Sequence, residues 1–481
     1  MRFLILLSLT WCLAACSLTP ELHRPAPPVP ARFPLQDDSF EGGAMTAPVN
    51  ELGWRSMFGD SRLQRLIDLA LQNNRDLRLA ILNVEAAQAV SRIQLAGHLP
   101  SVSVDASHAR ERATAPSGER ISSRDISKQV GVSLGVSAFE LDLFGRVRAL
   151  SDAALARYLA SEYGREAVQI TLVSAVADAY FAQQLAKEQR ELAEQTLADW
   201  RQSLSLARLL MQAEQNSGLD MAQAEGQVAL AEADLQARQR ALTQAGNALQ
   251  LLVGSELPSN LPLALPLEQQ PIIARLPAGV PAELLLTRPD LRQAEQMLVA
   301  SNADIGAARA AFFPQISLTA SFGYASTSLS GLFDPARQVW RFVPQISQPL
   351  FQGGRLRAEM RLAKVRNSEA VAQYERAIQT AFREVADALA GTATFDRQIE
   401  AQLHAVTAAQ RRLELSNLRY QSGFEGRLEL LDAQRQLYIA RQALLELRRE
   451  DIINTVALYK ALGGGLHAAS LNSPSRVVPS T

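Results

Sequence analysis

The sequence is a tandem duplication, and this feature constrains the fold more than any other. Positions 145–254 match positions 354–463 without a gap, at an offset of 209 residues. The clearest part of the match is Val176–Ala179, whose four residues recur unchanged as Val385–Ala388. A length of 481 residues would by itself suggest about three domains. Self-similarity at a fixed period instead predicts two copies of one structural unit, each about 210 residues long.

The duplication also predicts how the chain is divided. We expect the first repeat over residues 51–270 and the second over residues 271–463, followed by a C-terminal tail at 464–481. Each repeat has the predicted order helix, β-hairpin, very long helix, helix. The tail begins with glycines and continues with serine and proline, which predicts a loose or surface-bound segment.

Each repeat contains a predicted β-hairpin, at about residues 100–139 and 314–350. Apolar residues alternate with glycine and serine along 130–137, and the same alternation runs through 316–325. An apolar face opposite a face of small and polar residues is typical of a membrane barrel wall between lipid and water. A soluble sheet packed on helices is the alternative interpretation.

The segments that follow the hairpins predict very long helices. Neither Gly145–Ala213 nor Gly354–Tyr420 contains proline, and each could extend about 100 Å as a helix. Apolar residues, many of them alanine, recur at spacings of three and four from Val168 to Trp200. This spacing predicts coiled-coil packing with close helix approach.

The N-terminus predicts export and a lipid anchor. A basic residue, an apolar stretch and then Leu13-Ala14-Ala15-Cys16 are typical of a secretory signal peptide, here residues 1–15. The last four residues resemble the bacterial lipobox, which implies acylation of Cys16 and, with Ser17 next, sorting to the outer membrane. An ordinary signal with an incidental cysteine is the alternative. Residues 16–50 are then the lipid anchor and a tether, whose proline-rich part at 20–34 predicts an extended chain.

Composition argues against several functions. The 48 basic and 49 acidic side chains give a net charge of −1, which offers no general attraction for nucleic acid. The 5 histidines and 2 cysteines show no metal-ligand spacing, and no Gly-Lys-Ser/Thr phosphate loop is present. We therefore expect no enzyme activity, no metal and no cofactor other than the covalent lipid on Cys16.

The predicted strands require more than one chain. Four strands cannot close a membrane barrel, and an unpaired strand edge is not tolerated in lipid. Two chains would give a barrel too narrow for much passage, whereas three chains would give twelve strands and a plausible lumen.

Taken together, the lipobox, the tether, the duplicated unit and the segment Leu52–Asp60 resemble the outer membrane factors, that is, the TolC family, and within it the lipidated OprM/NodT-like branch. The likeness covers essentially all of the mature chain. It implies a mainly α protein with membrane β-strands, a homotrimer with a twelve-stranded barrel in the outer membrane, and an α-helical tunnel across the periplasm.

The resemblance also implies a function. Members of this family are passive exit ducts of tripartite pumps, joined through a periplasmic adaptor to an inner-membrane transporter, here of the proton-driven RND type, that expels drugs or other toxic compounds. The alternatives are a duct for type I protein secretion and a structural lipoprotein that forms no channel.

The same likeness implies a gate at the periplasmic tip of the tunnel. Glu429 and Asp432 match the acidic pore constriction, although spacing alone is more typical of a solvated helix face. Three chains would bring six such carboxylates around the axis, repelling anions and attracting cations. Tyr420 and Asp220 match a latch between helix pairs. The tip turns, expected to dock the adaptor, contain Gly218, Gly423 and Gly426, and we expect the last two to permit the tight turn.

Overall fold

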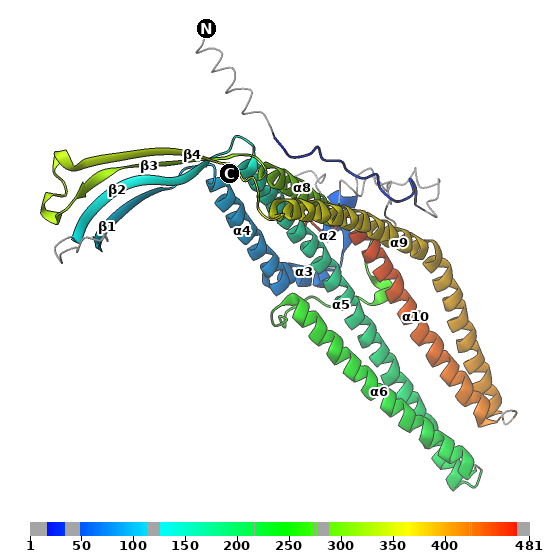
Figure 1. The fold of residues 1–481 in the computed structure, drawn as a ribbon. Coiled ribbons are helices and arrows are strands. Elements are labelled where there is room, and N and C mark those ends of the chain that lie inside the picture. The colour runs from blue at the N-terminus through cyan, green and yellow to red at the C-terminus, as the bar shows by residue number, and fades with distance from the viewer. Residues whose placement is uncertain are drawn as a thin grey trace, which may run out of the picture. The chain divides into compact units, whose positions relative to one another are not determined.

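The computed structural model shows a mostly helical chain with one small sheet (Figure 1). It describes residues 17–33, 49–112, 126–215, 217–273, 276, 288–422, 424 and 426–468. The predicted signal peptide, Cys16, Gly423 and the last part of the tail lie outside these residues. Within them, no helix has both the length and the apolar character needed to cross a membrane.

The helices fall into short and very long ones. The short helices are α2 (Trp54–Met57), α3 (Ser61–Asn73), α4 (Arg75–Ala96) and α8 (Pro289–Ala310). The long ones are α5 (Arg146–Gln212), α6 (Gly218–Val253), α9 (Arg355–Gln421) and α10 (Arg427–Ala461). Short 3-10 turns lie at Val49–Glu51, Leu267–Gln269, Leu329–Gly331 and Pro335–Arg337. Both α5 and α9 have 67 residues, which corresponds to about 100 Å of helix.

Glycines define where the long helices begin and end in both repeats. Gly145 and Gly354, directly before α5 and α9, have φ of 74° and 89°. Gly254 and Gly463, near the ends of α6 and α10, have φ of 75° and 83°. Residues with a side chain rarely adopt this left-handed conformation. At Gly254 a side chain would also be blocked, because a Cβ would lie 2.5 Å from the carbonyl oxygen of Asn73.

The strands form one antiparallel sheet in the order β1-β2-β3-β4. The first hairpin consists of β1 (Val102–Arg112) and β2 (Ile126–Leu141), and the second of β3 (Gln315–Ser326) and β4 (Gln338–Ser347). The hairpins join through β2 and β3, with a bulge between Val136 and Phe139. A Cβ on Gly323 would lie 2.1 Å from the carbonyl oxygen of Val132, so the strands approach closely there only because this residue is glycine.

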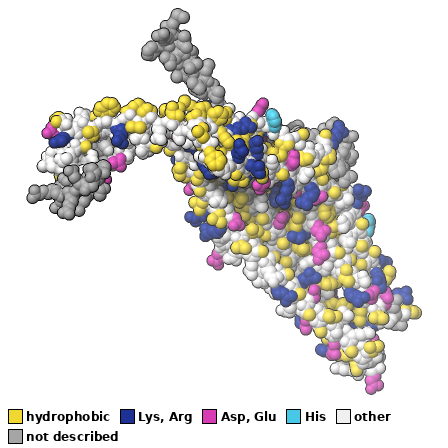
Figure 2. Space-filling model, in the orientation of Figure 1, with side chains coloured by type: hydrophobic (Ala, Val, Ile, Leu, Met, Phe, Trp, Pro, Cys, Tyr) yellow, Lys and Arg dark blue, Asp and Glu magenta, His cyan; other side chains and the backbone are white. Residues whose placement is uncertain are grey.

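The sheet exposes large apolar side chains. All ten residues of β4 are exposed, including Trp340 at 76% and Ile346 at 69%. On β1, Val104 is 69% exposed. Figure 2 shows hydrophobic side chains gathered along the sheet. An apolar surface of this kind is unusual for a sheet that faces water and is typical of a surface that another apolar phase or protein covers.

The chain forms two compact units, and each unit contains parts of both repeats. One unit comprises the described residues up to Ala26 with Asn83–Glu162 and Gln293–Tyr374, and so includes the whole sheet. The other comprises Pro27–Leu82, Tyr163–Arg292 and the described residues from Glu375 onward. The compact units therefore do not coincide with the sequence repeats.

The core of the second unit contains the segment Leu52–Asp60. Trp54 and Phe58 are fully buried, and the Phe58 ring meets the edge of Tyr459 with ring centroids 6.0 Å apart. The Tyr459 hydroxyl donates to the Leu52 carbonyl oxygen at 2.6 Å. Asp60 caps α3 by accepting from the backbone N–H of Arg62 at 2.7 Å, and its carboxylate also accepts from the Tyr180 hydroxyl at 2.5 Å. This segment is therefore a packing element that joins α2, α3, α5 and α10.

Candidate functional site

The two predicted constriction residues lie together at the beginning of α10, where they meet an arginine from α9. The Arg412 guanidinium binds Glu429 through Nη2, and its Nε lies 3.2 Å from the same Glu429 oxygen. Arg412 Nη2 also donates to Asp432 Oδ2 at 2.9 Å. Arg435 Nη2 donates to the other Asp432 oxygen, Oδ1, at 2.6 Å. The two carboxylates thus share one face of α10, as their spacing predicts.

These contacts change the electrostatic character expected for the constriction. Arg435 and Arg412 lower the pKa of Asp432, which keeps it ionised, and the bond to Glu429 raises the pKa of Arg412. Two guanidinium groups therefore face two carboxylates within one chain. The resemblance implied a ring of carboxylates that attracts cations, and the structure adds that both carboxylates are paired with arginines within one chain. Arg412 was missed because it lies on the other helix of the hairpin, and only the register between α9 and α10 brings it near Glu429.

The predicted latch residues are not joined to each other in the part of the chain that the structure describes. Asp220 forms a capping box with Ser217: its backbone N–H donates to Ser217 Oγ at 3.2 Å, and its carboxylate accepts from the Ser217 backbone N–H at 3.3 Å. Tyr420 lies in the last turn of α9. Asp220 therefore stabilises the beginning of α6, and the latch stays a prediction.

Of the two glycines expected to permit the tight tip turn, Gly426 differs from that expectation. Gly426 caps α10 with φ −73° and ψ 160°, an extended conformation that any residue can adopt, so the turn does not require glycine at this position. Gly218 is the first residue of α6, and a Cβ on either glycine would meet open space. Gly423 lies outside the described residues. The left-handed residue that the structure does show at a tip is Glu214, with φ 57°.

A second tyrosine–aspartate pair, which sequence reasoning missed, joins α10 to α6. The Tyr438 hydroxyl donates to Asp234, which also pairs with Arg238 at 3.3 Å. Arg238 in turn donates to Gln189 of α5 at 3.0 Å. Burial, reinforced by Asp234, raises the pKa of Tyr438 to about 12, so the hydroxyl keeps its proton. Gln442 donates to the same hydroxyl at 2.9 Å.

The start of α10 is fixed to α5. The buried Arg427 side chain donates to the backbone oxygen and to Oγ of Ser203, each at 3.0 Å. One turn farther on, Leu431 enters an apolar cluster formed otherwise by α5 and α6. The buried members of this cluster are Leu197, Trp200, Leu204, Ala207, Ala224, Val228 and Leu431.

Residues 18–20 of the tether lie along α8. Asn302 donates to the Pro20 carbonyl oxygen at 2.8 Å, and Arg309 donates to the Leu18 carbonyl oxygen at 3.2 Å. A Cβ on Gly306 would lie 2.2 Å from Thr19 Oγ1, so the tether contacts the helix where glycine leaves room. The segment that follows the predicted lipidation site is therefore bound to the surface of α8.

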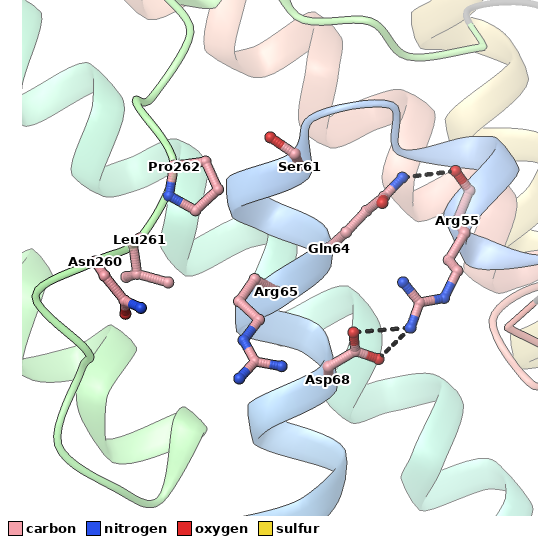
Figure 3. A pocket seen from close by; sticks show the side chains of 8 residues that line it. All are labelled: Arg55, Ser61, Gln64, Arg65, Asp68, Asn260, Leu261 and Pro262. Carbon is pink, nitrogen blue, oxygen red and sulfur yellow. Dashed lines mark hydrogen bonds and ion pairs between the residues drawn. The ribbon is translucent and has the colours of Figure 1, made fainter.

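A polar surface cavity of about 300 Å³ lies beside α3 (Figure 3). Arg55 on its wall forms an ion pair with Asp68, in which Nη2 of Arg55 donates to both carboxylate oxygens at 2.6 and 2.8 Å. Gln64 donates to the backbone oxygens of Arg55 and Phe58, at 2.9 and 2.7 Å. These polar groups already satisfy one another, so they form a structural junction between α2 and α3.

Helices about 100 Å long, joined to a four-stranded sheet with exposed apolar residues, define the class of TolC-like outer membrane channels. Residues 66–255 and 280–464 both match the model of the outer membrane efflux protein family. The chain belongs to this family.

Relatives and solved structures agree with this assignment. The chain is 44% identical to the solvent efflux pump outer membrane protein SrpC of Pseudomonas putida, over 94% of this chain and 96% of the relative. It is 41% identical to the cation efflux system protein CusC of Escherichia coli, again over 94% and 96%. The open-state structure of the Neisseria gonorrhoeae MtrE outer membrane channel matches 95% of this chain and all of that chain, with a TM-score of 0.85 and 38% identity. The predicted family, fold class and function as an outer membrane efflux channel are thereby confirmed.

Proposed function

We propose that three copies of this chain form the exit duct of a tripartite efflux pump and passively conduct toxic compounds out of the cell. The observation that carries the proposal is the exposure of β4, which is an edge strand of the sheet. All ten residues of β4 are exposed, among them Trp340, Phe342 and Ile346. An apolar edge strand in lipid must be paired. Pairing β4 of one chain with β1 of the next, three times over, would close a twelve-stranded barrel.

The partners follow from this role. A duct has no means of driving transport, so an inner-membrane transporter, of the proton-driven RND type, would supply the energy and select the substrate. A periplasmic adaptor would join it to the tips of the α5–α6 and α9–α10 hairpins. The family consists of channel and transport proteins, which supports a chain without enzyme activity. Solvents and cations, named for two relatives, are the substrate classes to test first.

The test is conductance by the purified full-length chain in planar bilayers, together with its oligomeric state in detergent. We expect a trimer that resists heat in detergent and produces discrete single-channel currents. A monomer without conductance would contradict the duct and favour a structural lipoprotein. If the gene lies beside genes for a protein-secretion transporter, the duct serves secretion instead of efflux.

The gate is proposed at the tip. Glu429 and Asp432 would form the constriction, and Tyr420 would bond to Asp220 across helix pairs in the closed assembly. Replacing both carboxylates with alanine should change cation block, whereas unchanged single-channel behaviour would reject the ring. Combining Tyr420→Phe with Asp220→Ala should raise conductance, and a double variant that stays closed would reject the latch.

The lipid anchor is also a proposal. The lipobox-like sequence before Cys16 supports acylation. The hydrogen bonds from α8 to Leu18 and Pro20 also support it, because they would hold the residues next to a lipidated Cys16 at a fixed position on the protein. Metabolic labelling with a palmitate analogue should label the wild type and leave Cys16→Ser unlabelled. Equal labelling of both chains would place the lipid elsewhere.

A further inference from the structure

A single arginine of α9 faces both predicted constriction carboxylates of α10. We propose that Arg412 is the counter-ion that sets the charge of the Glu429–Asp432 constriction and thereby the ion selectivity of the channel. The inference rests on the proposed function, because selectivity has meaning only if the assembled chains conduct.

The geometry places one guanidinium between two carboxylates. Arg412 contacts Glu429 through Nε and Nη2 and contacts Asp432 through Nη2 at 2.9 Å. Arg435 holds the second oxygen of Asp432 at 2.6 Å. Two positive and two negative groups therefore share this surface, which carries no net formal charge. Without Arg412, each chain would present one unbalanced carboxylate, and a trimer would present three.

Stability does not account for this arrangement. The side chains of Arg412 and Glu429 are each 42% exposed, and that of Asp432 is 29% exposed. Ion pairs this accessible to water contribute little to folding. The same hairpin is already joined by Gln402, which donates to the Ala440 carbonyl oxygen at 2.9 Å. Removing Arg412 should therefore leave the hairpin folded and change mainly the local potential.

Local potential is what a narrow water-filled constriction senses. Rings of charged side chains determine which ions enter a pore, and low-dielectric walls concentrate their field. Arg435 and Arg412 lower the pKa of Asp432, which favours its ionised form. The balance at the constriction therefore depends on the arginines rather than on protonation.

The first repeat shows that this balance is particular to the second hairpin. At the offset of 209 residues, Arg412 aligns with Ser203 and Glu429 aligns with Asp220. Asp220 bonds to its own neighbour Ser217, and Ser203 accepts from Arg427. Both hairpins thus have a carboxylate at this position, and among the residues that the structure describes it is paired with a cation of the preceding long helix in the second hairpin but not in the first, whose α5–α6 ion pairs lie at Glu225 and Glu232.

The test compares full-length Arg412→Gln with wild type in planar bilayers under a KCl gradient. We expect the variant to favour potassium over chloride at least about twofold more than wild type, because three extra negative charges then face the pore. Block by hexaamminecobalt(III) should strengthen by about tenfold, since a trivalent cation responds most to added negative charge. Arg412→Lys, which keeps the charge, should retain wild-type selectivity.

Two controls isolate the position of the charge. Arg411→Gln removes the same charge from the adjacent residue, which pairs with Glu414 at 3.2 Å, and should leave selectivity unchanged. Adding Glu429→Gln and Asp432→Asn to Arg412→Gln should abolish the gain in block. Conducting channels whose selectivity and block are the same in wild type and Arg412→Gln would overturn the inference alone. Absence of any conductance by wild type would overturn the proposed function and the inference with it.

Discussion

The two helical hairpins descend from one duplicated unit but occupy different surroundings. Helices α6 and α10 have 36 and 35 residues, yet α6 buries four residues and α10 buries thirteen. On α6, Leu219, Leu230 and Leu251 are 68%, 65% and 79% exposed. Helix α10 instead packs against α5 and α6 of the other hairpin through Leu431, Arg427 and Tyr438. The second repeat therefore supplies an interior helix, and the first supplies a surface helix.

The first residues of α6 and α10 also differ in whether their stabilising contacts are local or come from the other repeat. A capping box of Ser217 and Asp220 satisfies the start of α6 locally. Gly426 at the start of α10 offers no side-chain cap, and Arg427 binds α5 instead. The start of α6 is thus stabilised by a local side-chain cap, and the start of α10 by a contact with α5 of the other repeat. Substitutions at aligned positions of the two repeats test this contrast.

The largest effect is expected for Arg427→Ala. The change removes two charge-assisted hydrogen bonds from the buried Arg427 side chain to Ser203, at a cost of about 2–3 kcal/mol. Amides in the second turn of α10 should then exchange with deuterium about 30- to 150-fold faster.

The matched control for this prediction is Arg411→Ala. The Arg411 side chain is 69% exposed and pairs with Glu414 on its own helix, so its loss should leave the same amides within about twofold of wild type. Equal acceleration in both variants would show that α10 is not held through Ser203.

The next largest effect concerns the close approach of α9 and α10 at Gly391. A Cβ there would lie 2.2 Å from Asn454 Oδ1. Gly391→Ala should therefore displace the Asn454 side chain and break its bonds to Ala388 and Thr392, which are 3.0 and 3.2 Å long. We expect a loss of about 2 kcal/mol in local opening free energy, measured by hydrogen exchange in both helices.

The first repeat supplies the rescue. The positions aligned with Gly391 and Asn454 are Ala182 and Ala245. The double variant Gly391→Ala/Asn454→Ala reproduces that pair and should recover most of the lost protection, because the clash disappears. A double variant less stable than Gly391→Ala alone would mean that the hydrogen bonds of Asn454, rather than the clash, dominate.

A smaller effect depends on pH and contrasts Asp178 with its aligned partner Asp387. Burial raises the pKa of Asp178 from 3.8 to about 6, although Arg449 and Lys460 oppose the rise. The folded protein therefore holds this proton more tightly than the unfolded chain does. The contribution of Asp178 to the free energy of unfolding falls as the pH rises from about 4 to 6 and is constant above pH 6. Allowing for partial exposure, the cost above pH 6 is about 1–2 kcal/mol.

Asp178→Asn should remove this cost. Thermal unfolding at pH 8 should occur at a higher temperature in the variant than in wild type, and the difference should vanish near pH 4. Asp387 is 73% exposed and pairs with Arg383, so Asp387→Asn should leave the pH dependence unchanged. An Asp178→Asn difference that is independent of pH would show that packing rather than charge is responsible.

Local patterns explain why much of the fold was predictable. Period-two alternation and proline-free stretches placed the sheet and the two long helices, since these signals lie within each segment. The pairing of Arg412 with Glu429 and of Tyr438 with Asp234 depends on register between helices far apart in sequence, which no local pattern specifies. Gly426 shows the converse, because a glycine in a turn suggested a special conformation that the backbone there does not adopt.

The smallest effect is expected at Glu214, which follows the end of α5 by two residues and has the left-handed conformation with φ 57°. Its aligned residue in the second repeat is Gly423. A residue with a side chain is strained in this conformation, so Glu214→Gly should stabilise the end of α5 by about 0.5–1 kcal/mol, less than the full strain because glycine gains entropy on unfolding. Hydrogen exchange of Glu214 and Gln215, whose N–H groups bond back to Met211 and Leu210, would detect slower opening. Glu214→Ala retains the Cβ and should give no such gain; an equal gain would assign the effect to loss of the carboxylate rather than to the backbone.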